Sequence, residues 1–473
     1  MAWKQLSPTP SHITYILLSG FLILYALFSK FIRDRLHLAE PPLATLFGIL
    51  SGPACLNVID PAKWIDKDST TEEITRIVVG VQVFVIGVEL PRRWIRSRYT
   101  SLLMLLGPVM TTSYLVTAFL VYYIADTRLL PAFVISACLA PTDPVLSASV
   151  LGNSHFSERI PKRLRDLLGA ESGANDGVSF PFLYIPIYLL LKKTTGEAMK
   201  EWFLITILYE CLLGLSLGIL IGRGANMGLR FLTKKKMIDP AAFLSFYLLL
   251  ALFSIGVGCT LGVDDFLVAF GAGAAFSYDG WFAKRTEETH LPQVIDLIFN
   301  SSFFIYFGAT VPWHLFASRE HELNVGMLIG LTIAILFLRR IPALLICWKW
   351  IPEVKSFREA LFCGWFGPMG VGAMFLSITA LSQLESGSST PMPKPPPDGP
   401  FSESIIRIKP IVSFVVLGSI LVHGISTGFI SVYGHFMRHS EHRADSIGAE
   451  QDLLDGFVGS DYGSTESFDP NDD

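Results

Sequence analysis

The chain has 473 residues, of which 51% are hydrophobic and only 16% are charged, and its formal net charge is −4. Its mean hydropathy is +0.48, whereas soluble domains carry roughly a quarter charged residues. The composition therefore excludes a soluble globular domain and indicates a protein that folds in lipid; we expect no nucleic-acid partner.

Apolar segments long enough to cross about 30 Å of hydrocarbon recur almost without pause along the chain. We count about thirteen of them, which predicts an all-α polytopic membrane protein. Their ranges are close to 12–29, 42–59, 74–90, 100–123, 131–151, 167–191, 203–222, 240–258, 262–278, 293–311, 324–348, 358–382 and 405–432. The least regular is the ninth, because it is short and carries Asp264 and Asp265 near its start.

Basic residues predict the orientation of these spans. The first span is followed by Lys30 and Arg33 rather than by a small-residue cleavage site, so we expect a retained anchor. If residues 1–11 lie outside, the inside segments hold more than twice as many lysines and arginines as the outside ones. The positive-inside rule then predicts an external N-terminus and a cytosolic C-terminus.

Two stretches are predicted to lie off the membrane. Residues 383–404 form a Pro/Ser-rich segment, expected outside, which cannot bury a core. Residues 433–473 form a short acidic tail, expected in the cytosol and without a packed core. The six cysteines fall within or beside apolar spans and are interpreted as packing residues rather than as a disulfide framework.

The fifth span predicts a broken helix. Pro141 and Pro144 bracket Thr142 and Asp143 inside an apolar run. Proline removes an amide donor and clashes with the preceding turn, so the helix should end near Pro141 and restart at Pro144, with Asp143 as its N-cap. Unwound backbone at that depth is tolerated only when it is buried in protein or lines a cavity.

The twelfth span predicts a second break, because it contains Gly364 and the sequence GPMGVG at 367–372. Either motif alone could be a packing kink. Each, however, is fifth in its block of six spans, and paired interruptions of this kind indicate an inverted-repeat transporter with a site near the midplane. The repeats would cover 12–191 and 240–432, with 203–222 as a linker helix.

The sixth span carries polar residues that a lipid-facing helix should not contain: Glu171, Ser172, Asn175 and Asp176. A charge at the bilayer centre costs roughly 2.5 kcal/mol or more, so such residues face protein or water and have a function. Glu171 and Asp176 lie about 140° apart around the helix and so address different neighbours.

Glu171 needs a cation, and the candidates are Arg339 and Arg340 of the eleventh span, with a slight preference for Arg340. The alternative is that both arginines extend to the inner interface. Asp176 is then left without a fixed cation. A desolvated carboxylate of this kind can hold a proton or a small cation, but not comfortably both.

Neighbouring oxygen atoms from Asn175, Thr142 and Asp143 could complete a shell for a hard cation such as Na⁺ or Li⁺ at Asp176. The alternative interpretation of Asn-Asp-Gly is a turn, which would leave backbone groups unpaired in hydrocarbon. Asp264 and Asp265 are secondary candidates, either as external attractors of cations or as an N-cap pair.

Five motifs together resemble the fungal plasma-membrane sodium/proton antiporters of the monovalent cation/proton antiporter superfamily. They are APTDPVLSASV (140–150), AESGANDGVSFPFLY (170–184), GVDDFLVAFGAG (262–273), RRIP (339–342) and GWFGPMGVGAM (364–374). The resemblance extends over residues 12–432. The Thr-Asp-Pro and Asn-Asp elements are specific in combination, whereas either alone is not.

The resemblance implies thirteen spans in two inverted repeats, crossed and partly unwound helices in a mobile core domain, and a homodimer. It implies that Asp176 binds the ion with Asn175 beside it, that Thr142 and Asp143 form the unwound-helix pair, and that Glu171 pairs with an arginine of the eleventh span. Family members export Na⁺ and Li⁺, and some also K⁺ and Rb⁺, in exchange for protons. Trp365 departs from several relatives, which carry histidine there, and the tail is shorter than in some members.

We therefore expect a secondary antiporter of the plasma membrane, or alternatively of endosomes, that needs no cofactor. It would export Na⁺ or Li⁺, with K⁺ as a further candidate, by competition with H⁺ at Asp176 and alternating access. The alternatives are a cation channel and a membrane sensor or scaffold. The sequence contains no HExxH motif, so we do not expect a membrane-embedded enzyme.

Overall fold

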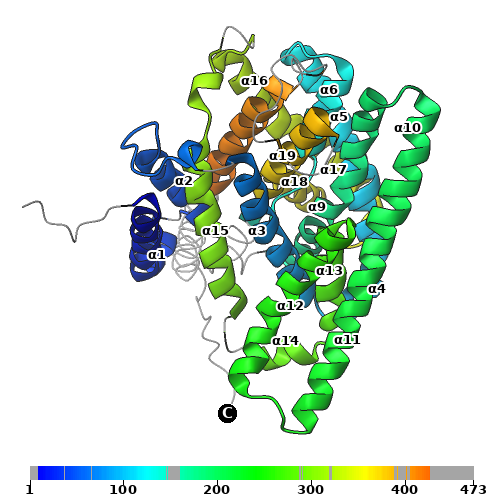
Figure 1. Ribbon diagram of the computed structural model, residues 1–473. Helices are drawn as coiled ribbons and strands as arrows, with labels where there is room; N and C mark the ends of the chain where they lie inside the picture. The colour runs from blue at the N-terminus through cyan, green and yellow to red at the C-terminus, as the bar shows by residue number, and fades with distance from the viewer. Residues whose placement is uncertain are drawn as a thin grey trace, which may run out of the picture.

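The computed structural model describes residues 9–36, 38–64, 67–144, 146–147, 160–286, 289, 291–318, 322–387, 391–392, 401 and 405–426. Every regular element within these ranges is helical, and none of the described residues forms a strand. The prediction of an all-α polytopic protein is confirmed (Figure 1). The predicted tail at 433–473 and most of the predicted loop at 383–404 lie outside the described residues.

The α-helices are, in chain order, α1 (Pro10–Asp34), α2 (Glu40–Ser51), α3 (Lys67–Glu89), α4 (Trp94–Met104), α5 (Met110–Ile124), α6 (Leu129–Leu139), α9 (Lys162–Leu191), α10 (Thr195–Glu201), α11 (Gly214–Lys234), α12 (Pro240–Leu261), α13 (Asp265–Phe276), α14 (Trp281–Thr286), α15 (Leu291–Thr310), α16 (Val325–Leu338), α17 (Ile341–Cys347), α18 (Phe357–Trp365) and α19 (Val371–Ser386). A further helix covers Ile405–Ser426. The π-helical stretches η2 (Leu105–Val109) and η3 (Trp202–Leu213) join α4 to α5 and α10 to α11.

Helical residues occur in each of the thirteen predicted segments. Seven helices of the described chain are long and apolar enough to cross a bilayer, and α6 and α13 are shorter apolar helices. The count of thirteen crossings therefore stays a prediction. The predicted linker at 203–222 lies inside one continuous helix over Thr195–Lys234, which runs along one edge of the bundle (Figure 1).

Two predicted boundaries differ from the structure. The predicted span 42–59 is helical only to Ser51, because Gly52 precedes Pro53 and the residue before a proline is disfavoured in helical conformation. The predicted loop from 383 begins later, since α19 continues to Ser386 and ends at Gly387, which has a positive φ of 65°.

One set of helices is assembled around α13, which packs against α3, α11 and α12. Glycines allow this close approach: a methyl group at Gly222 of α11 would overlap the carbonyl oxygen of Ala272, and one at Gly273 would overlap that of Phe84 in α3. Small residues at such contacts are typical of helix packing in membranes, where van der Waals fit replaces the hydrophobic effect.

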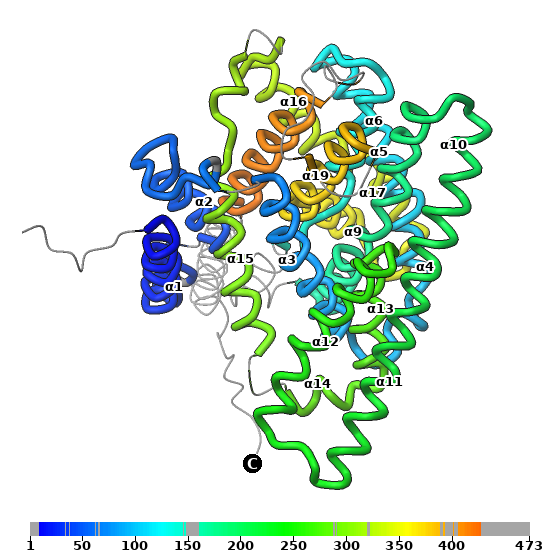
Figure 2. The backbone as a smooth tube through the Cα atoms, viewed as in Figure 1, coloured from blue at the N-terminus to red at the C-terminus, as the bar shows by residue number. Residues whose placement is uncertain are grey.

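A second set of helices contains both breaks, with α6 packed against α5, α9 and α19, and α17 packed against α18. The two sets meet where α3, α9, α13 and α19 pack together at the centre of the bundle (Figure 2). The outermost helix, α1, contacts α15 and exposes apolar side chains such as Leu27, which is 73% exposed. An apolar face of this kind suits a lipid environment.

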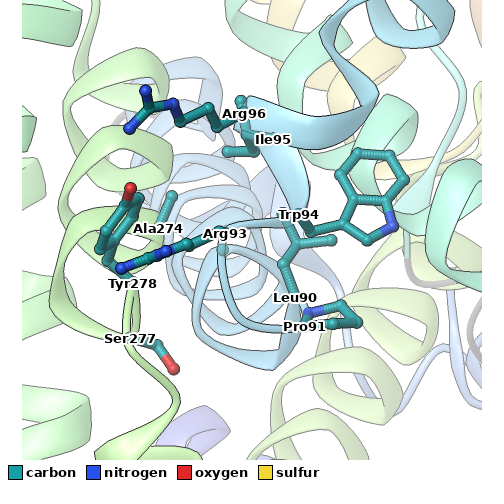
Figure 3. A pocket seen from close by; sticks show the side chains of 10 residues that line it. Leu90, Pro91, Arg93, Trp94, Ile95, Arg96, Ala274, Ser277 and Tyr278 are labelled. Atoms are coloured by element: carbon teal, nitrogen blue, oxygen red, sulfur yellow. The ribbon is translucent and has the colours of Figure 1, made fainter.

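A small cavity of about 30 Å³ lies between the turn from α3 to α4 and the end of α13. Arg93, at φ 57°, donates its backbone N–H to the carbonyl oxygen of Tyr278, 3.2 Å away. Figure 3 shows the Arg93 side chain alongside Tyr278, while Trp94 points to the other side of the turn. This volume holds about one water molecule. The cavity is therefore no site for a larger ligand.

Candidate ion-binding site

The site is built on two interrupted helices that complete each other's hydrogen bonding. The first breaks between α6 and a helical turn at Pro144, and the second breaks between α18 and α19. The backbone N–H of Asp143 donates to the carbonyl oxygen of Pro368 at 2.7 Å, and the N–H of Val371 donates to Asp143 Oδ2 at 2.9 Å. Both predicted breaks are therefore present, and each supplies partners to the other's unwound backbone.

Asp143 is positioned by this crossing. Its carboxylate receives the first amide of α19, where the helix N-terminus favours a negative charge. The sequence predicted Asp143 as the cap of the helix that follows it, and the N–H of Ser147 does donate to the backbone carbonyl oxygen of Asp143 at 3.2 Å. The contact of its carboxylate with Val371 of the other broken helix was not predicted. A Cβ at Gly370 would overlap the Asp143 carboxylate, so only glycine fits there.

Arg339 joins the opposite ends of the two broken helices. Its guanidinium donates to the carbonyl oxygens of Leu139, Ala140 and Pro141 at the end of α6 and to that of Gly367 after α18. Helix C-termini carry partial negative charge, and a buried cation there satisfies both of them. Sequence reasoning did not find this role.

Arg340 meets Glu171 in a bidentate ion pair. Arg340 Nη1 and Nη2 donate to the two carboxylate oxygens at 2.5 and 2.7 Å, and Nε donates to the carbonyl oxygen of Cys363 at 3.0 Å. Glu171 is 3% exposed and Arg340 5%. The pair thus ties α9 to α17 and α18 within the protein, and neither arginine of the pair Arg339–Arg340 extends to the surface.

Asp176 has the opposite surroundings. It is only 1% exposed, and within the described chain neither carboxylate oxygen has a hydrogen-bond partner. One oxygen lies against the backbone of Gly372, where a Cβ would overlap it. Asp143 and Asp264 are near enough to interact with it electrostatically. These neighbours are negative, so they do not compensate its charge.

A hydrogen-bonded chain orients the amide beside Asp176. Asn175 Nδ2 donates to Thr142 Oγ1 at 2.7 Å, and Thr142 Oγ1 lies 3.0 Å from Ser172 Oγ. The structure therefore brings Thr142, Ser172 and Asn175 together and leaves the amide oxygen of Asn175 without a partner among the described residues. Oxygen donors of this kind suit hard cations.

The two secondary candidates have different partners. Asp264 Oδ1 caps α13 by accepting from the N–H of Leu267 at 2.9 Å. It also faces α9, since a Cβ at Gly177 would lie 3.2 Å from it. Asp265 pairs with Arg76 at 3.2 Å and shares this guanidinium with Glu72 and Glu73. Both are buried rather than exposed at a mouth, and of the two only Asp264 approaches Asp176.

Sequence reasoning also missed His423, which lies behind the second break. His423 Nε2 is 3.0 Å from the carbonyl oxygen of Trp365, and their ring centroids are 5.5 Å apart. Ser419, one turn earlier, accepts from the N–H of Met369 at 2.8 Å. A histidine thus lies beside Trp365, the position at which several relatives carry histidine, but it belongs to a helix that is distant in the sequence. No local pattern in the sequence signals this.

Comparisons with known proteins identify the relatives of this chain. A family profile described as "Sodium/hydrogen exchanger, transmembrane" matches residues 21–433. A Na⁺/H⁺ antiporter of Saccharomyces cerevisiae is 44% identical over 92% of this chain and 45% of its own length. A probable Na⁺/H⁺ antiporter of Schizosaccharomyces pombe is 43% identical over 91% of this chain and 57% of its own length. The chain thus spans about half the length of these relatives.

Two further proteins are matched along nearly their whole length. A Na⁺/H⁺ antiporter of Schizosaccharomyces pombe is 36% identical over 92% of this chain and 93% of its own length. The structure of the sodium proton antiporter MjNhaP1 from Methanocaldococcus jannaschii superimposes with a TM-score of 0.66, covering 90% of this chain and 98% of that one. At 16% identity this second likeness shows the fold alone.

Proposed function

The chain belongs to the sodium/hydrogen exchanger family of transmembrane proteins, and from this premise we propose that it exchanges Na⁺ for H⁺ across a membrane by secondary active transport. Relatives that carry the name Na⁺/H⁺ antiporter support this proposal along more than nine-tenths of the chain. As in the relatives so named, the activity would be transport rather than enzymatic catalysis.

The observation that carries the mechanism is the unpaired carboxylate of Asp176. An ionised carboxylate removed from water is costly unless a cation or a proton neutralises it. Asp176 is buried and has no hydrogen-bond partner within the described residues, which supports a partner taken up from solution. Na⁺ and H⁺ would then compete for one position, and each could leave only when the other replaces it.

The neighbouring groups would complete the cation's shell. Asn175 is held by its amide nitrogen on Thr142, so its oxygen stays directed away from that bond and available to a cation. Asp143 would add negative charge without leaving the cap of α19. Glu171 would not take part, because Arg340 occupies both of its oxygens.

Alternating access would expose Asp176 to each side in turn. The crossed helices α6, α18 and α19 would move with α9 as a core domain against α3, α11, α12 and α13. The packing of α6 against α9 and α19, and of α13 against α3, α11 and α12, supports such a division. The family resemblance supports further parts of the same proposal. They are Li⁺ and K⁺ as further substrates, a homodimer, two inverted repeats, an external N-terminus and residence in the plasma membrane.

The test uses the protein reconstituted in sealed proteoliposomes. An outward Na⁺ gradient should drive proton uptake, and Asp176→Asn should abolish it. The matched control is Asp166→Asn, the same substitution in the first turns of the same helix, which should leave the exchange unchanged. Normal exchange by Asp176→Asn would contradict the mechanism. A cation channel would instead pass Na⁺ with no proton counterflow in the unaltered protein, and a sensor or scaffold would pass neither ion.

A further inference from the structure

Three aromatic rings form a layer one helical turn from Asp176. Phe180 follows Asp176 by one turn on α9, Phe375 follows Gly372 by about one turn on α19, and Phe266 lies near the start of α13. The ring centroids are 4.8 Å apart for Phe266 and Phe375, 6.1 Å for Phe180 and Phe266, and 6.3 Å for Phe180 and Phe375. We call these three residues the aromatic layer.

The layer lies on the side of the membrane where α9 ends. Phe180 is nearer than Asp176 to the end of α9, and Phe375 is nearer than Gly372 to the end of α19. All three rings are buried, with Phe266 1% exposed, Phe375 2% and Phe180 8%. The three rings are therefore packed out of solvent on that side of Asp176.

Arg76 of α3 lies over one ring of the aromatic layer, that of Phe375. Its guanidinium carbon lies 5.2 Å from the centroid of Phe375, and its side chain is 15% exposed. Glu72 and Asp265 hold it at 2.6 and 3.2 Å. On leaving Asp176 toward this side, a cation would thus meet the aromatic rings and an ion-paired arginine that lies over one of them.

The contacts of the layer cross the boundary between the two sets of helices. Phe180 and Phe375 belong to α9 and α19, which carry or contact the site, whereas Phe266 and Arg76 belong to α13 and α3. Phe266 touches both rings of the other set, and Arg76 touches one of them. A displacement of one set against the other would open these contacts and leave each set internally intact.

We propose that Phe180, Phe266 and Phe375, together with Arg76, form the gate that closes Asp176 from the side on which α9 ends. An apolar constriction excludes hydrated ions by dewetting, and the ion-paired Arg76 covers the Phe375 ring. The inference rests on the proposed function, since it assigns to these residues the closed side of an alternating-access cycle. A purely structural cluster would contribute to packing but would not control access.

The experiment measures access to Asp176 without measuring transport. A membrane-impermeant carbodiimide, which reacts with accessible carboxyl groups, is applied to intact cells or to inverted vesicles, and the adduct on Asp176 is quantified by mass spectrometry. Phe375→Ala and Phe266→Ala should raise the labelling rate at least fivefold from the side where α9 ends, and not from the other side. Asp176→Asn shows that the adduct belongs to that residue.

The matched control is Phe276→Ala, which removes an equally buried ring from α13. Phe276 packs against Phe246 and Phe282, away from the aromatic layer, and its loss should leave the labelling rate unchanged. If the alanine variants do not fold, Phe375→Leu and Phe266→Leu provide milder openings with the same one-sided effect.

Unchanged labelling in folded variants of the layer, or an equal increase from both sides, would overturn the gate. Failure of the unaltered protein to exchange Na⁺ for H⁺ would instead overturn the proposed function. The labelling rates would still report the access to Asp176, because they do not depend on transport. The two failures are therefore distinguishable.

Discussion

Glu171 and Asp176 lie five residues apart on α9 and are equally shut away from solvent, yet one carboxylate is fully paired and the other has no partner within the described chain. Arg340 donates a hydrogen bond to each carboxylate oxygen of Glu171. The pairing of Glu171 fixes the helix, and it leaves Asp176 as the buried acid whose charge a mobile ion can neutralise. The proposed mechanism thus assigns structure and transport to different carboxylates of one helix.

Removal of one partner of the buried pair should destabilise the protein strongly. Glu171→Gln leaves the Arg340 guanidinium buried without a counter-charge, and the expected loss is about 3–5 kcal/mol of unfolding free energy. The measurement is denaturant unfolding in detergent micelles. Glu359→Gln breaks the partly exposed pair with Arg163 and should cost about 1 kcal/mol or less. Equal losses in the two variants would contradict the structural role of Glu171.

The two adjacent arginines should respond differently to lysine. Arg339→Lys keeps a positive charge near the carbonyl oxygens of the two helix ends and should retain a substantial part of the exchange rate. Arg340→Lys cannot reproduce two parallel bonds to Glu171 together with the bond to Cys363, so it should lose most of its stability and rate. Unfolding midpoints and exchange rates of both variants, compared with the alanine variants, test this. Equal rescue at both positions would argue against the separate roles.

The fold and the acidic residue of the site could be predicted from the sequence because their signals are local. Apolar runs marked the helices, and Pro141 and Gly367 with Pro368 marked the two breaks. The partner of each side chain could not be predicted. Arg339 and Arg340 are neighbours in the chain, and only the packing of α9 against α17 decides which of them meets Glu171. His423 reaches Trp365 across 58 positions of sequence, which no local pattern encodes.

A methyl group at Gly372 should remove the space that the ion site needs. A Cβ there would overlap Asp176 Oδ1, so Gly372→Ala should displace the carboxylate and reduce Na⁺-driven proton uptake at least tenfold. Gly330→Ala on α16 is the control, because a Cβ at Gly330 meets nothing within 4 Å, and alanine favours helix over glycine. Exchange rates are compared at equal amounts of folded protein. Full activity of Gly372→Ala would place the site elsewhere.

The hydroxyl of Thr142 should set the affinity for Na⁺ through Asn175. Thr142→Val removes the acceptor that holds Asn175 Nδ2, so the amide is free to rotate and its oxygen is no longer directed to the cation. The loss of one such bond corresponds to about 1.4 kcal/mol, or roughly a tenfold higher KM for Na⁺, with a smaller change in the maximal rate. Thr142→Ser keeps the hydroxyl and should stay close to the unaltered protein. The Na⁺ dependence of exchange measures both variants, and an identical KM in the serine and valine variants would show that the hydroxyl does not orient the amide.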